Sequence, residues 1–131
     1  MKKYIVILLF FFAHILAAQN TESSNNVDSN IYNAKAVDKQ PEYPGGLAEF
    51  DNFIKANFRK PETNQGMSGK IVAMIVVHID GSISDMKILR DFGSGSGKET
   101  IRLLRMTSNW IPAEKDGKKV NTKMLLTLNI N

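Results

Sequence analysis

The stretch from Phe92 to Thr100 comes nearest to a chemical motif. Glycines alternate with serines and lead into Lys98, between an expected strand and an expected helix, which is the setting of a phosphate-binding loop. In that loop a Ser or Thr follows the lysine directly and binds the magnesium ion. Here Glu99 follows, and Phe92 stands where the first glycine belongs. We therefore predict a flexible loop and a helix start rather than a nucleotide site.

Histidine and carboxylate side chains give little support for a metal site. The sequence contains two histidines and no cysteine. His14 lies in the apolar N-terminal run, so His78 is alone in the rest of the chain and carboxylates would have to supply the other zinc ligands. The carboxylates closest to it in sequence lie at expected turns and strand ends: Asp80, Asp85 and Asp91. We expect no metal and no cofactor.

Nucleophilic catalysis has equally few candidates. Ser94 and Ser96 belong to the glycine-rich stretch, but a serine nucleophile needs a base, and His78 would have to be recruited from another element. We expect no catalytic residues and no enzymatic activity. A small periplasmic enzyme whose activity depends on His78 or Asp85 is kept as an alternative.

The N-terminus predicts export. Lys2 and Lys3 precede an apolar stretch from Tyr4 to Ala18 that ends in small residues, which is the three-part pattern of a secretory signal peptide. A membrane-spanning helix needs roughly 20 apolar residues, so this stretch is short for an anchor. We predict a signal peptide over residues 1–18, cut before Gln19, and a periplasmic mature protein. An inner-membrane anchor facing the periplasm is the alternative.

The remaining residues are enough for one domain. Residues 19–39 are polar and rich in Asn and Ser, which predicts a flexible leader, and residues 40–131 form the predicted domain. With no cysteine, that domain must fold on its apolar core without disulfides. The net charge is only +4, which does not indicate the dense basic face of a nucleic-acid-binding protein.

Two amphipathic helices are predicted. The first follows the proline- and glycine-rich segment 40–46 and ends before Pro61. Its apolar stripe consists of Leu47, Phe50, Phe53, Ile54 and Phe58. The second spans about Lys98 to Thr107. The residues expected to face inward on it are Ile101, Leu104 and Met106.

Three strands complete the predicted fold. Lys70 to Ile79 is rich in Ile and Val, and the Asp80-Gly81 turn leads to a second strand from Ser82 to Arg90. From Val120 to Ile130 apolar residues alternate with an outward set, which predicts a half-buried strand. The outward set is Asn121, Lys123, Thr127 and Asn129. The predicted class is α+β, a small antiparallel three-stranded sheet with two helices on one face.

Several short motifs follow one another in a recognisable order. Pro-Glu-Tyr-Pro-Gly-Gly precedes the first helix, a strand runs from Gly69 towards Asp-Gly, and Trp-Ile-Pro and a Gly-Lys-Lys-Val turn precede the last strand. From about Ala36 to Asn131 this resembles the C-terminal domain of TonB, in the variety with a Pro-Gly-Gly element. The motif residues with a structural role are Pro41, Tyr43, Pro44, Gly45, Gly46, Gly69, Asp80, Gly81, Trp110, Pro112 and Gly117.

The resemblance implies a periplasmic binding module. In the TonB family this domain binds the TonB box, a short segment of outer-membrane receptors, by strand pairing at a sheet edge. By analogy the edge is the last strand: Val120, Asn121, Thr122, Lys123, Met124, Leu125, Leu126, Thr127, Leu128, Asn129 and Ile130. Lys123 is either a contact residue or a charge that protects the edge. A homodimer through the same edge is an alternative.

The sequence departs from the family in two places. The family has Tyr-Pro after the first helix, whereas this chain has Lys60-Pro61. Energy-transducing TonB also keeps its N-terminal helix in the inner membrane beside ExbB and ExbD and has a long proline-rich spacer, whereas the leader here is short and proline-free. Since His14 lies within the apolar run, a short membrane-anchored transducer remains an alternative, with ExbB and ExbD as partners only if that helix is retained.

Overall fold

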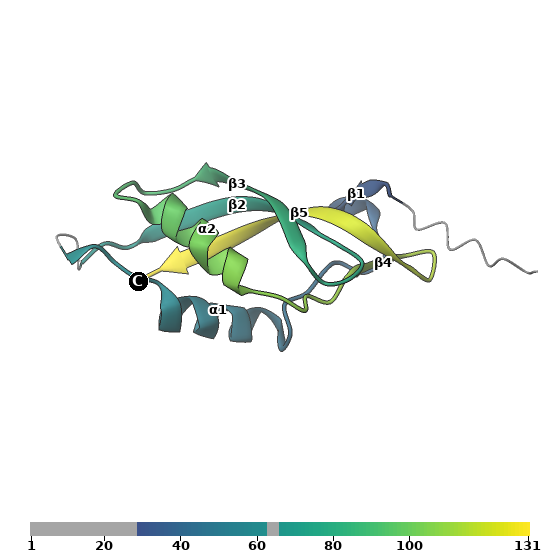
Figure 1. Cartoon of the computed structure of the whole chain (residues 1–131), viewed down its shortest axis with the longest axis horizontal. Coiled ribbons are helices and arrows are strands. Elements are labelled where there is room, and N and C mark those ends of the chain that lie inside the picture. Colours follow the sequence, from purple (N-terminus) through teal and green to yellow (C-terminus); the bar gives the residue numbers. More distant parts are fainter. Residues whose placement is uncertain (1–28, 63–65) are drawn as a thin grey trace, which may run out of the picture.

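The computed structural model describes residues 29–62 and 66–131 (Figure 1). Their elements, in chain order, are β1 (Ile31–Asn33), the 3₁₀ turn η1 (Ala34–Ala36), α1 (Gly46–Asn57), β2 (Gly69–Val77), β3 (Ile83–Arg90), α2 (Ser96–Met106), β4 (Ala113–Lys115) and β5 (Lys118–Ile130). The predicted α+β class is confirmed. The predicted signal peptide lies outside the described residues.

β5 is the organising strand of the sheet. It pairs antiparallel with β2 along the whole of Gly69–Val77, and β2 pairs antiparallel with β3. β4 forms a hairpin with the start of β5 and pairs with Lys118–Val120. β1 pairs in parallel with the next three residues of β5, Asn121–Lys123. The predicted three-stranded antiparallel sheet is therefore correct for β2, β3 and β5 but omitted two short strands, one of which makes the sheet mixed.

The prediction of a flexible leader as far as Lys39 is wrong for residues 31–39. β1 pairs with β5, and the N–H groups of Asp38 and Lys39 donate to the Glu114 carbonyl oxygen at 2.9 and 3.0 Å. The segment has too few apolar residues to form structure by itself. It is ordered because the β4–β5 hairpin supplies backbone partners, which a local sequence pattern does not reveal.

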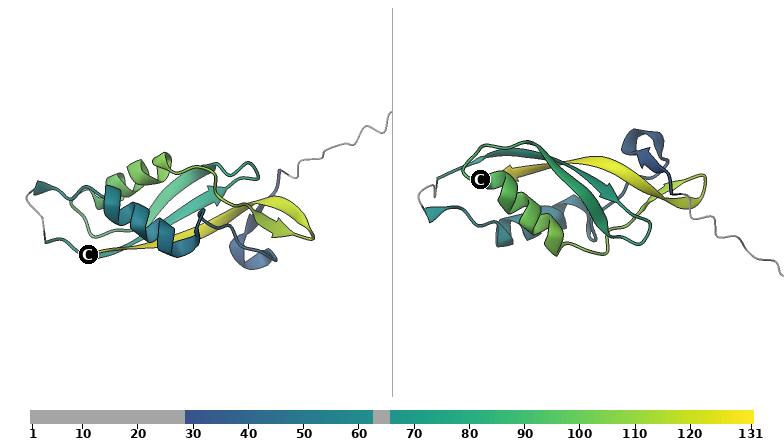
Figure 2. Two further views of the ribbon diagram at one scale, coloured as in Figure 1. Left: turned by 90° about the horizontal axis from the view of Figure 1, so that it is seen from below. Right: turned by 45° about the horizontal axis from the view of Figure 1, so that its top comes forward.

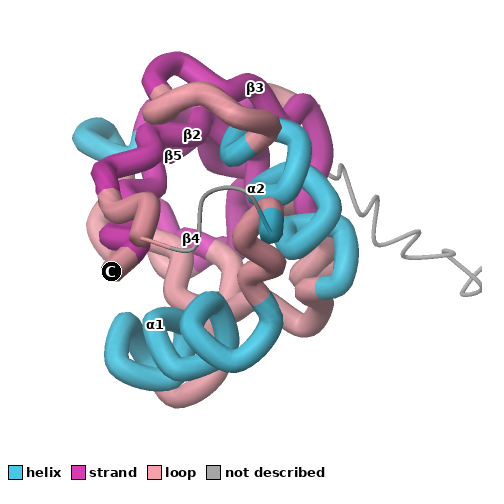
Figure 3. The backbone as a smooth tube through the Cα atoms, turned by 90° about the vertical axis from the view of Figure 1, so that its left-hand side faces the viewer, coloured by secondary structure: helices cyan, strands magenta, loops and turns pink. Residues whose placement is uncertain are grey.

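Both helices lie on the same face of the sheet, as predicted (Figures 1 and 2). The sheet curls around that face, with α1 and α2 side by side against it (Figure 3). The buried core combines both helices with β2 and β5, and its largest fully buried side chains include Phe50, Ile71, Ile75, Leu103 and Leu128.

Two residues predicted to face inward are exposed instead. Leu47 in the first turn of α1 is 77% exposed, and Met106 at the last residue of α2 is 52% exposed. Both residues lie at helix ends. The apolar stripe extends to these positions, but the sheet covers only the middle of each helix.

The Pro-Gly-Gly segment places an aromatic ring in the core. The Gly46 N–H donates to the Tyr43 carbonyl oxygen at 2.8 Å, which closes the turn before α1. The Tyr43 ring then contacts Phe50 and Trp110, with ring centroids 5.2 and 5.4 Å apart. Gly45 has φ +86°, a conformation that favours glycine, and a Cβ there would lie 2.5 Å from Glu49 Cγ. This turn therefore fixes where α1 begins.

The Asp80-Gly81 turn is tied to the segment after α2. The Trp110 N–H donates to the Gly81 carbonyl oxygen at 3.0 Å, and the indole Nε1 donates to Thr107 Oγ1 at 3.0 Å. Gly81 has φ +83°, and a Cβ there would lie 2.7 Å from the Trp110 carbonyl oxygen. This position thus requires glycine for both its conformation and its close backbone contact.

Candidate functional site

The outer edge of β5 is divided into an occupied and an open part. On the inner side, β2 pairs with Thr122–Ile130. β4 pairs with Lys118–Val120 at the start of β5, and on the outer side, opposite β2, β1 pairs with Asn121–Lys123. Within the described residues no strand pairs with the outer side of 124–130. This open stretch presents backbone N–H and C=O groups that an extended chain can pair with.

A cavity opens beside this edge on the helix side. It has a volume of about 290 Å³ and lies between the start of α1 and β5. Met124 and Leu126 form one wall, and Leu47, Tyr43 and Trp110 contribute to the other. The exposure of Leu47, which is surprising for a leucine next to the core, places an apolar surface at the mouth of this cavity.

A second cavity lies on the opposite face of β5. Its volume is about 410 Å³, and its lining includes Met74, Lys123, Leu125 and Lys35. Leu125 is 58% exposed. Met124-Leu125-Leu126 is a run of apolar residues in a strand that otherwise alternates, so this run was the sequence signal for apolar surface on both faces.

A third cavity of about 170 Å³ lies at the C-terminal end of the edge. It is lined by the end of α1 and by Asn129–Asn131, and it includes the side chains of Lys55, Phe58 and Lys60. The Lys60 ammonium donates to the Asn131 carbonyl oxygen at 2.6 Å. Lysines therefore stand at both ends of the open edge, with Lys35 and Lys123 at one end and Lys55 and Lys60 at the other.

The structure places most of the predicted outward residues of β5 at the surface. Lys123, Thr127 and Asn129 are exposed. Asn121 was predicted to face outward and is buried instead, because its Oδ1 accepts the Ile79 N–H at 3.0 Å and thereby ties β5 to the end of β2. The remaining predicted edge residues lie along the same strand: Val120, Thr122, Met124, Leu125, Leu126, Leu128 and Ile130.

His78 is engaged in a local contact at the end of β2. Its Nε2 lies 2.6 Å from Ser84 Oγ, and Ser84 Oγ lies 3.5 Å from an Asp85 carboxylate oxygen. The Ser82 hydroxyl and the Ser82 N–H both donate hydrogen bonds to the Asp80 carboxylate. These two bonds lower the pKa of Asp80, and the hydroxyl has the larger effect. Across residues 29–62 and 66–131, no group of three or more potential ligand side chains could hold a metal ion.

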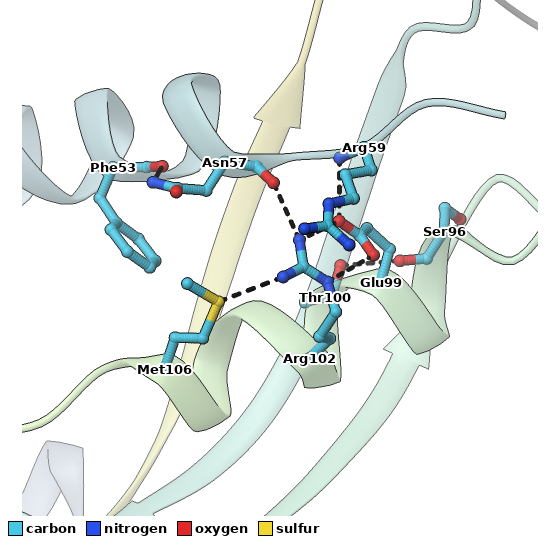
Figure 4. Close-up of polar contacts among 8 residues, drawn as sticks. All are labelled: Phe53, Asn57, Arg59, Ser96, Glu99, Thr100, Arg102 and Met106. Atoms are coloured by element: carbon cyan, nitrogen blue, oxygen red, sulfur yellow. Dashed lines mark hydrogen bonds and ion pairs between the residues drawn. The ribbon is translucent and has the colours of Figure 1, made fainter. Parts of the chain in front are cut away.

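The glycine-rich loop leads into α2 without a side-chain cap. Gly95 is the N-cap residue, and α2 begins at Ser96. Further along, Arg102 forms an ion pair with Glu99 and donates to the Asn57 carbonyl oxygen at 2.9 Å, at the end of α1 (Figure 4). The Arg59 N–H also donates to Glu99, at 2.8 Å. Glu99 and Arg102 thus clamp the two helices together, and these contacts lower the pKa of Glu99, with the Arg102 hydrogen bonds as the main cause.

Sequence comparison decides the family. The family described as Gram-negative bacterial TonB protein C-terminal matches residues 60–131, which is more than half of the chain. The chain belongs to the TonB C-terminal domain family. The resemblance drawn from the sequence motifs is thereby confirmed. TonB C-terminal domains are periplasmic, are associated with transport rather than catalysis, and have protein partners such as outer-membrane receptors.

The fold agrees with this family. The solution structure of the Helicobacter pylori TonB C-terminal domain matches with a TM-score of 0.53 and 15% identity, over 65% of this chain and 91% of that one. A second, longer solution structure of the same domain matches with a TM-score of 0.39 and 16% identity, over 65% and 80% of the two chains. No curated protein sequence matches the chain. Among the described residues, no helix has both the length and the apolar character needed to cross a bilayer.

Proposed function

We propose that this TonB-type domain binds an extended segment of a partner protein by strand addition to the open part of the β5 edge, residues 124–130. The observation that supports the proposal is the unpaired outer side of that stretch, flanked by cavities on both faces. Backbone pairing supplies affinity in this mode of recognition, and pockets for alternate side chains supply specificity.

The side chains around the edge indicate what kind of segment fits. An added strand points successive side chains to opposite faces of the sheet, so one set meets the Leu47 cavity and the other meets the Leu125 cavity. Apolar side chains at the centre of the segment fit both. The lysines at the two ends of the edge favour acidic residues at the ends of the segment.

The proposed setting follows the family. We propose a mature protein released into the periplasm by cleavage of residues 1–18, with a segment of a TonB-dependent outer-membrane receptor as partner. The alternative, a short transducer retained in the inner membrane beside ExbB and ExbD, differs in the fate of those residues. N-terminal sequencing after cell fractionation separates the two, since a soluble mature protein that begins near Gln19 excludes the anchor.

Peptide titration followed by NMR tests the binding mode. Peptides that carry TonB-box segments are added to the isotope-labelled protein, and a scrambled peptide of the same composition is the control. We expect saturable shifts of the backbone amides in 124–130, with smaller changes in β3 on the far side of the sheet. If no amide between Val120 and Ile130 shifts with any such peptide, strand addition at β5 is wrong.

A further inference from the structure

β1 already occupies part of the edge to which the proposed partner segment adds. The strand order β1-β5-β2-β3 places β1 on the side of β5 opposite β2, where it pairs in parallel with Asn121–Lys123 (Figure 1). The open stretch 124–130 follows directly on the same side. The chain thus adds a strand of its own to this edge. A partner segment that extends past the open stretch towards the start of β5 meets β1, whichever way the segment runs.

The contacts that hold β1 against the domain are few. The strand has three residues, none of them buried, and Ile31 is 49% exposed. The 3₁₀ turn η1 that follows it has no buried residue either. The Lys115 ammonium lies 5.9 Å from the centre of the Tyr32 ring and donates an exposed hydrogen bond to the Ala36 carbonyl oxygen at 3.2 Å. Contacts of this kind contribute little because water competes for the same groups. Release of β1 therefore takes none of its own side chains out of the core.

The segment after η1 is anchored separately. The N–H groups of Asp38 and Lys39 donate to the Glu114 carbonyl oxygen, and the Glu114 N–H donates to the Lys39 carbonyl oxygen at 3.0 Å. Further on, Glu42 and Ile111 exchange two backbone hydrogen bonds of 3.0 and 2.8 Å. These bonds do not involve β1, so β1 can leave β5 about a hinge before Asp38 while the rest of the domain stays in place.

We infer, on the basis of the proposed function, that β1 is a displaceable strand that competes with the partner segment for β5. In the free protein β1 covers the backbone groups of Asn121–Lys123. The bound segment takes the place of β1 and pairs with β5 from residue 121 to residue 130. Because strand pairing is exchanged for strand pairing, the cost is confined to the exposed contacts of β1 and η1. Lys123 belongs to β5 and keeps its positive charge at this end of the edge.

A reversible cross-link tests this competition within one protein. Asn33 and Lys123 are direct partners in the β1–β5 register, and the chain has no cysteine, so Asn33→Cys with Lys123→Cys allows one intramolecular disulfide. A TonB-box peptide is titrated with and without reductant, and the amides of 124–130 are followed by NMR. We expect the oxidised form to bind at least about fivefold more weakly than the reduced form, because a locked β1 keeps its part of the edge. Equal affinities, or tighter binding by the oxidised form, would overturn the inference.

Loosening β1 is expected to have the opposite effect. Ile31→Pro combined with Tyr32→Pro removes a donor to β5, because successive N–H groups of a strand point to opposite sides and one of the two must face β5. We expect about three- to tenfold tighter binding of the peptide, since less of the protein has the edge covered. Ile31→Val keeps both donors and should bind as the wild type does. Unchanged or weaker binding by the folded double variant would contradict the inference.

The amides of β1 distinguish this inference from the proposed function. At saturation of the wild-type protein with the peptide, we expect the amides of residues 31–33 to lose their protection from hydrogen exchange. If 124–130 respond while residues 31–33 stay protected, strand addition stands and the displacement of β1 is wrong. If neither stretch responds to any such peptide, both are wrong.

Discussion

Replacing Leu47 by alanine should weaken partner binding without weakening the fold. Leu47 is 77% exposed and lines the helix-side cavity next to Met124 and Leu126. Its side chain contributes little to the core of the free protein, and both leucine and alanine favour helix. We therefore expect the free energy of unfolding to change by less than about 0.5 kcal/mol.

The binding loss can be worked out from burial. Full burial of a leucine side chain contributes about 1.5–3 kcal/mol, and most of the Leu47 side chain is available to be covered by an added segment. Alanine keeps only the first carbon of that surface, and the cavity wall would cover the leucine incompletely. We expect a loss of about 1 kcal/mol, which is about a fivefold increase in Kd.

Calorimetric titration with a binding TonB-box peptide measures this effect. Leu89→Ala is the matched control, because Leu89 is also exposed but lies on β3, away from the β5 edge. We expect Leu89→Ala to bind as the wild type does. An unchanged Kd for folded Leu47→Ala, or equal losses for both variants, would refute the placement of the segment beside this cavity.

Three further predictions concern the framework around these sites. Gly81→Ala should lower the free energy of unfolding by about 3 kcal/mol in urea titration, because a Cβ at φ +83° would lie 2.7 Å from a backbone oxygen; a loss below about 1 kcal/mol would contradict this. Glu99→Gln should lower the free energy of unfolding by about 1 kcal/mol at pH 6. Because the pKa of Glu99 is lowered in the folded protein, the ionised carboxylate stabilises the fold above the ordinary Glu value of 4.5, and the difference in unfolding free energy from the wild type should narrow as the pH falls below that value and the carboxyl protonates. The exposed control Glu114→Gln should show no such narrowing. Ser96→Ala should stabilise the free protein by about 0.5–1 kcal/mol in thermal unfolding, since it removes a buried hydroxyl without a partner, and a destabilisation would mean that this hydroxyl is satisfied.

The sequence predicted those elements whose signal is local. β2, β3, β5 and both helices follow from runs and periodicities that span at least two turns or several strand residues. β1 could not be found in this way, because it has three residues and owes its order to parallel pairing with Asn121–Lys123 of β5. The burial of Asn121 has a similar cause, a hydrogen bond to Ile79 at the end of a neighbouring strand.

The sequence predicted the strand that carries the candidate site, but not which part of its edge is open or which cavities lie beside it. Alternation located β5, and the family resemblance pointed to it as the edge. How much of that edge stays open depends on β1, which pairs with its first part at Asn121–Lys123. The cavities depend on residues from separate elements, such as Leu47 in α1 and Met124 in β5. The only sequence signal for these cavities was the apolar run Met124-Leu125-Leu126.

Hydrogen exchange of the β5 amides in the peptide complex tests strand addition most directly. In an antiparallel sheet, successive N–H groups of a strand point to alternate sides, so the outward-pointing amides in 124–130 lack a strand partner in the free protein. The account predicts that alternate amides in this stretch become protected when a TonB-box peptide saturates the protein, while amides already paired with β2 change little. Unchanged exchange along the whole stretch at saturation would contradict it.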